Sequence, residues 1–183
     1  TSISRNQDGL TAVTVNGREE LAAEVVIMAV GHSARDTYYM LHDKGVAMES
    51  KPFAVGVRIG HTQELIDRSQ YGCPAHDLGL DAADYALVYH SPDGRSAYSF
   101  CMCPGGQVVA AASEEGLVVT NGMSLYKRDS GIANSALVVN VTTDDVGGKP
   151  LDGIEFQRRY ERLAFEKGGG NYHAPAQTVG AFM

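Results

Sequence analysis

The sequence has few cysteines, few cations and no long apolar run, and each shortage excludes a class of protein. Three cysteines, an odd number, do not make a disulfide framework and suit a reducing compartment. Lys and Arg total 15 against 22 Asp and Glu, which argues against a protein that binds nucleic-acid phosphates. The apolar runs are shorter than the roughly 18 residues of a membrane helix. We therefore expect a soluble, cytoplasmic protein with no nucleic-acid or membrane partner.

Several catalytic and metal-binding motifs are also missing. No H-E-x-x-H, G-x-S-x-G, G-x-x-x-x-G-K-[ST] or C-x-x-C pattern occurs. Cys73, His76, Cys101 and Cys103 form two pairs of soft ligands, but structural zinc sites usually place two to four residues between paired cysteines. Cys101 and Cys103 have only one residue between them. We predict no metal site.

The first part of the chain predicts a hairpin followed by a strand, a turn and a helix. "TSIS" and "LTAVTV" flank an Asp-Gly turn. The continuous apolar run "EVVIMAV" at 24–30 is typical of a strand buried on both faces of a sheet. Gly31 and His32 follow, and Ser33 is expected to cap a helix. Free backbone N–H groups at such a helix start suit an anionic group.

The rest of the chain predicts mainly β-structure and one long helix. Strands are expected at 53–59, 84–90, 96–103, 107–112, 117–120 and 135–141, and a helix at about 153–167. In the first of these strands Arg58 shares the open face, and Val57 the buried one. Asp152 is expected to cap this helix, which should bury Phe156, Tyr160, Leu163 and Ala164 and expose Arg158, Arg159, Arg162 and Glu166.

The stretch "SFCMCPGG" is the most unusual part of the sequence. Strand alternation places Tyr98, Phe100 and Met102 in the core and puts Cys101 and Cys103 together on a face of small residues. Such a face is expected where another backbone or a flat ligand lies against the strand. Free cysteine is also a common small core residue, so packing and chemistry both stay open for this pair.

Five blocks of sequence resemble one known family. "VVIMAVGHSARDTYYMLHDKGVAMESKPFAVGVRIGH", "LGLDAADYALVYH", "SFCMCPGGQVVAAASEEGLVVTNGMS", "NSALVVNV" and "GGGNYHAPAQTVGAF" are similar, in this order, to the middle section of bacterial FAD-dependent dehydrogenases, often called NAD(FAD)-utilising dehydrogenases. The resemblance covers nearly the whole chain. Cys73 lies outside the family pattern.

The resemblance implies roles for particular residues. Gly31, His32, Ser33 and Ala34, with Gly105 and Gly106, would contact the flavin cofactor. Arg58 would face the substrate, and Cys101 and Cys103 would be redox or acid partners of the flavin. The implied partners are a small-molecule substrate and the remainder of a longer parent chain, with NAD(P)H as an electron donor.

The G-x-G-x-x-G turn that holds the ADP part of FAD is absent from the sequence. We therefore expect FAD in the full-length protein but not in this chain alone, which we interpret as part of a longer polypeptide. The alternative function is a non-enzymatic α+β module that binds a ligand or subunit on an open sheet face around Arg58.

The predicted fold is α+β, with a mostly antiparallel, partly barrel-like sheet and two or three helices over residues 51–183. Residues 1–50 are expected to be the remnant of an α/β dinucleotide-binding domain.

Overall fold

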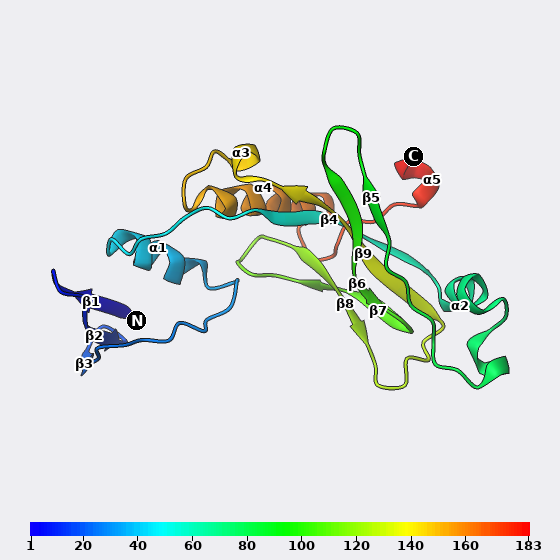
Figure 1. The fold of residues 1–183 in the computed structure, drawn as a ribbon, viewed down its shortest axis with the longest axis horizontal. Helices are drawn as coiled ribbons and strands as arrows, with labels where there is room; N and C mark the ends of the chain where they lie inside the picture. Colours follow the sequence, from blue (N-terminus) through cyan, green and yellow to red (C-terminus); the bar gives the residue numbers. More distant parts are fainter.

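The computed structural model describes residues 1–183 as a mixed α+β chain with three antiparallel sheets and five α-helices (Figure 1). The strands are β1 (Ser2–Arg5), β2 (Leu10–Val15), β3 (Glu19–Ala22), β4 (Phe53–Thr62), β5 (Val88–His90), β6 (Ser96–Cys103), β7 (Gly106–Ala111), β8 (Val119–Ser124) and β9 (Ile132–Val141). The helices are α1 (Arg35–Asp43), α2 (Gln63–Tyr71), α3 (Thr143–Val146), α4 (Asp152–Lys167) and α5 (Val179–Phe182), and a 3₁₀ turn spans Ala75–Leu78. The α+β prediction is confirmed.

The sheet of β4, β9, β6 and β5 ends in two free edges and forms no closed barrel. Residues 51–183 contain four helices, where the sequence predicts two or three. Two of the four, α3 and α5, are only four residues long, too short for a helical hydrophobic period to show in the sequence.

The central sheet has the order β4-β9-β6-β5, and its longest ladder pairs β4 with β9 over ten residues. The register places Gly60 opposite Asn134 and Arg58 opposite Ala136. β7 and β8 form a separate hairpin, and Gly122 of this hairpin lies against the side chains of Arg58 and Asn134. The hairpin therefore covers part of one face of the central sheet.

The face of β4 that the hairpin leaves uncovered is not the predicted one. Val57 was expected in the core but is 53% exposed, and Leu137 and Val139 of the neighbouring strand are exposed on the same face. Arg58, expected on the open face, is half-buried beneath Gly122. Alternation along a strand identifies its two faces but does not say which face a neighbouring element covers.

Helix α4 also differs from its prediction. Leu151, not Asp152, is its N-cap, while Asp152 accepts a hydrogen bond from the Lys149 N–H. Tyr160 and Leu163 are close to half exposed, and the buried residue of the helix is Glu161. Phe156 does pack edge-on against Phe53, with ring centroids 5.8 Å apart. The helix also packs through charged side chains, which a hydrophobic period cannot reveal.

The apolar run at 24–30 does not form the predicted buried strand. These residues have no regular secondary structure, and the side chains of Val25 and Ile27 are 82% and 89% exposed. A strand buried on both faces requires pairing strands beside it and layers above and below it. The nearby sheet of β1, β2 and β3 pairs only within itself (Figure 1). No helix of the chain combines the length and the apolar character needed to span a bilayer.

Candidate functional site

The most densely organised polar cluster of the central sheet surrounds Arg58. Its Nη1 donates to Asn134 Oδ1 and lies 3.7 Å from Cys103 Sγ, while Nη2 donates to the Cys101 carbonyl at 3.2 Å. No carboxylate pairs with Arg58. The cluster therefore holds a guanidinium through neutral acceptors, and its positive charge is not neutralised locally.

A bulge in β6 produces the two different positions of the cysteines. The register with β9 shifts between Phe100 and Cys103, and Cys101 has φ 48°, in the left-handed region. Cys101 is exposed and Cys103 is buried, and neither forms a disulfide. The prediction that they share a face is wrong because the bulge interrupts the alternation. Phe100, expected in the core, is 63% exposed although it precedes the bulge and stays paired with Ala136.

The glycines that follow the bulge make room for the chain itself. A Cβ at Gly105 would overlap the Arg128 carbonyl, and one at Gly106 would lie 2.6 Å from Ser124 Oγ. The Gly105 N–H also donates to Gln63 Oε1 at 2.8 Å. Packing against neighbouring segments thus explains why both positions are glycine.

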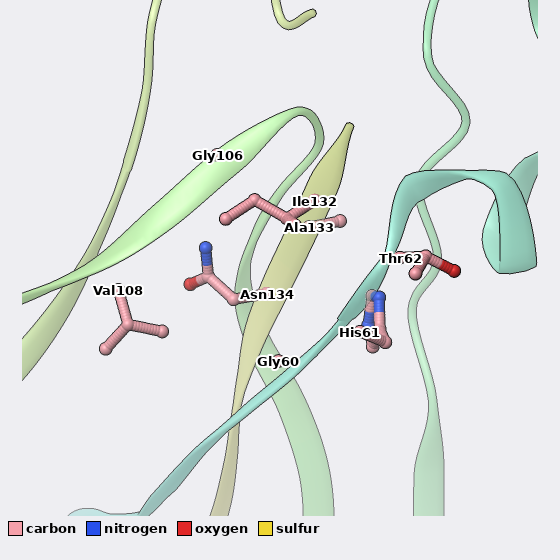
Figure 2. A pocket seen from close by; sticks show the side chains of 8 residues that line it. All are labelled: Gly60, His61, Thr62, Gly106, Val108, Ile132, Ala133 and Asn134. Carbon is pink, nitrogen blue, oxygen red and sulfur yellow. The ribbon is translucent and has the colours of Figure 1, made fainter. Parts of the chain in front are cut away.

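A pocket of about 320 Å³ lies beside the Arg58 cluster, between the central sheet and the β7–β8 hairpin (Figure 2). Its lining is mostly small or apolar and consists of Gly60, His61, Thr62, Gly106, Val108, Ile132, Ala133 and Asn134. In Figure 2 the Asn134 side chain extends from β9 toward Val108. Sequence reasoning missed Asn134, because an Asn in the strand "NSALVVNV" carries no distinctive signal.

The predicted cofactor turn at Gly31–Ala34 lies elsewhere in the molecule. Gly31 has φ 77°, which only glycine adopts easily, and a Cβ there would meet open space. Ser33 does not cap α1; Ala34 is the N-cap, and Ser33 Oγ lies 3.2 Å from Ser113 Oγ. Ser113 follows β7, whereas Gly106 begins it. The length of β7 therefore separates the two groups of predicted cofactor residues by about 15 Å or more.

An ion network next to this turn was not predicted. Arg35 is 3% exposed and forms a bidentate pair with Glu161 at 2.7 and 2.9 Å, and it also contacts Glu114 at 2.8 Å. Arg158, expected in solvent, binds Glu114 through two hydrogen bonds of 2.6 and 2.7 Å. Hydrogen bonds from Arg158 and then Arg35 lower the pKa of Glu114 to about 2. The network joins α1, the segment after β7, and α4.

These observations test whether the chain alone fits FAD. The turn at Gly31–Ala34 is open and offers the start of α1, which can contact an anionic group. Gly105 is closed by the Arg128 backbone, whereas Gly106 lines the small pocket beside the Arg58 cluster. The residues present do not form a complete FAD site. No group of three or more His, Cys, Asp or Glu side chains gathers in a way that would hold a metal ion.

Fold and site together define a mixed α+β domain with a small pocket between its central sheet and a β-hairpin. Residues 52–183 match the family model described as FAD-dependent protein, C-terminal domain-like. The chain belongs to this family.

A protein of Clostridium beijerinckii described as uncharacterised is 57% identical over 180 residues. The match covers 97% of this chain and 34% of that relative, so the chain spans about a third of the length of the relative. The comparisons thus place the chain in a family of FAD-dependent proteins and assign no reaction to it.

Proposed function

We propose that this chain is the substrate-side part of a flavin-dependent oxidoreductase whose FAD is held mainly by other regions of a longer polypeptide. In this arrangement the flavin supplies the hydride chemistry, and this chain supplies a pocket, orientation and electrostatics. Membership of a family of FAD-dependent proteins and the coverage of a third of a relative support the proposal.

The observation that carries the proposal is the amount of apolar surface left uncovered. The accessible surface is 12497 Å², whereas a compact monomer of this mass exposes about 8,500 Å². The exposed run at 24–30 has the composition of a central strand of a parallel sheet. We propose that these residues join a sheet in the nucleotide-binding domain to which residues 1–50 belong.

The two cysteines have different parts in this proposal. Cys101 is exposed, so it is the thiol that a substrate or flavin can reach, whereas Cys103 is buried against Arg58. We assign Cys101 as the candidate redox or acid partner and Cys103 as a residue that supports the position of Arg58. Cys101→Ser should then slow flavin reoxidation by substrate more than Cys103→Ser does.

The test is to purify the full-length protein and residues 1–183 separately. The full-length protein should show a flavin spectrum in stoichiometric amount and should oxidise NADH or NADPH when an acceptor is present. Residues 1–183 should bind FAD far more weakly. A full-length protein that neither carries nor binds flavin would reject the proposal and favour the non-enzymatic module. Stoichiometric flavin in residues 1–183 would reject the division of labour between the two regions.

A further inference from the structure

The pocket beside β4 contains a hydrogen-bond donor that has no partner. Asn134 is 1% exposed, and its Nδ2 makes no hydrogen bond. Because a guanidinium can only donate, the contact from Arg58 Nη1 identifies the Asn134 atom it meets as the amide oxygen. The NH₂ group of Asn134 is therefore held in one orientation, with both protons available.

An unpaired donor at this depth is unusual and points to a ligand. Leaving a buried donor unsatisfied is costly, so most buried polar groups are paired. The Arg58 charge polarises the amide through its oxygen and makes the free N–H a stronger donor. The matching group is an oxygen acceptor without a proton of its own, such as a carbonyl.

The glycine opposite Asn134 provides the second observation. Gly60 pairs directly with Asn134, and side chains of paired residues point to the same face. A Cβ at Gly60 would meet nothing within 4 Å, and the φ of Gly60 lies outside the left-handed region. Neither packing nor backbone conformation requires glycine here, although glycine weakens a strand interior. The missing side chain leaves open the space next to the free donor.

The rest of the lining restricts what this space can hold. Val108, Ile132 and Ala133 are apolar, and the volume of about 320 Å³ lies at the lower end of the range of small-molecule pockets. No Asp, Glu, Lys or Arg side chain lines the pocket, and His61 is its one titratable side chain. A small ring system with little charge fits this lining.

We propose that the pocket between β4, β7 and β9 binds a small, flat, uncharged molecule through a carbonyl oxygen that accepts from Asn134 Nδ2. Gly60 leaves room for the ring, and Arg58 orients the amide. The ligand is distinct from the flavin. This site does not depend on the proposed function, because it is built entirely from residues of this chain.

The experiment is a ligand-observed NMR titration of the full-length protein with 1-tetralone and with tetralin, which has the same ring frame without the carbonyl. Wild-type protein should bind 1-tetralone about tenfold more tightly than tetralin, as expected for one buried hydrogen bond. Asn134→Asp keeps an oxygen for Arg58 but replaces the donor with an acceptor, and should remove this preference. Asn140→Asp adds the same charge on β9 at an exposed position and should leave binding unchanged.

A second variant tests the space without changing the donor. Gly60→Val should abolish binding of both compounds, while the melting temperature stays equal or rises because a β-branched residue suits a strand. Equal affinity of wild-type protein for the two compounds, or unchanged binding in both Asn134→Asp and Gly60→Val, would overturn the proposal.

A titration at saturating FAD separates this ligand from the cofactor. Binding of 1-tetralone should persist when FAD is present. Full competition by FAD would assign the pocket to the flavin ring and overturn the proposal of a separate ligand. A protein that binds 1-tetralone but no flavin would leave this inference intact and reject the proposed function instead.

Discussion

At the scale of single residues, ion pairs join α1 to α4, a role that apolar side chains usually have between helices. Arg35 and Glu161 are both buried, and Gln157 adds a further contact to Arg35 at 3.2 Å. The hydrogen bonds to Glu161 raise the pKa of Arg35 although burial opposes this. A charge this deep is tolerated only because its partners meet it with good geometry.

Replacing Arg35 should be costly because it leaves Glu161 buried without a partner. Arg35→Met is expected to lower the free energy of unfolding by about 3 kcal/mol, measured by urea denaturation. Arg162→Met, on the exposed side of α4, the helix that carries Glu161, should change it by less than about 0.5 kcal/mol. The double variant Arg35→Met/Glu161→Leu should recover part of the loss. Equal effects of the Arg35 and Arg162 variants would contradict a stabilising network.

Glu114 should make the free energy of unfolding depend on pH in the acidic range. Its pKa is lowered from 4.5 to about 2 in the folded chain, so its contribution is fully present above about pH 4.5 and is lost as the pH falls toward 2. Because the side chain is 31% exposed, we expect an effect of about 1 kcal/mol. Urea unfolding at several pH values should show a shallower acid loss in Glu114→Gln than in wild type. Glu115→Gln, which removes an exposed and unpaired carboxylate, should keep the wild-type slope.

At the scale of elements, the two glycines of β4 have opposite reasons to be there. A Cβ at Gly56 would overlap the Leu137 carbonyl, so this glycine permits close approach of β9. Gly56→Ala should lower the free energy of unfolding by about 1–3 kcal/mol, whereas Gly60→Ala should leave it unchanged or raise it. Thermal unfolding followed by circular dichroism compares the two. A stable Gly56→Ala variant would show that β4 and β9 can move apart.

The bulge in β6 should separate the two thiols in reactivity. Cys101 is exposed, and Cys103 is 8% exposed beneath the β7–β8 hairpin. Under native conditions a disulfide reagent should modify Cys101 at least about tenfold faster than Cys103. Cys73, which is half-buried, is replaced in every protein compared. The single variants Cys101→Ser and Cys103→Ser then show which thiol each modification rate belongs to. Similar rates for both thiols would mean that the hairpin opens readily.

At the scale of the whole molecule, the exposed apolar run predicts a context-dependent effect. Ile27 is 89% exposed, so Ile27→Glu should hardly change the stability of residues 1–183 on their own. In the full-length protein the same change should lower the melting temperature by several degrees, since it would place a charge inside a sheet. Thr11→Glu, in β2, serves as an exposed control. No difference between the two lengths would mean that the run stays uncovered.

The local structure was largely readable from sequence patterns. The structure contains the elements predicted from the turns around Asp8 and the "SPDG" sequence, from the alternation in 53–59 and from the glycine-terminated helix pattern after Ser33. These signals depend on neighbours within a few residues, where backbone conformation and side-chain period act directly. The location of the pocket was not readable, since Gly60 and Asn134 are 74 positions apart and meet only through the β4–β9 register.

The sequence by itself determined the α+β composition, the order of most strands, the helices α1 and α4, and the presence of an unusual Cys-x-Cys segment before two glycines. Only the tertiary structure decided which face of β4 the hairpin covers, that Cys101 is exposed while Cys103 is buried, and that Arg35 and Arg158 form ion pairs. The physical reason is the separation along the chain over which each interaction acts. Turn and strand preferences act between adjacent residues, whereas burial, bulges and ion pairs depend on segments that only folding brings together.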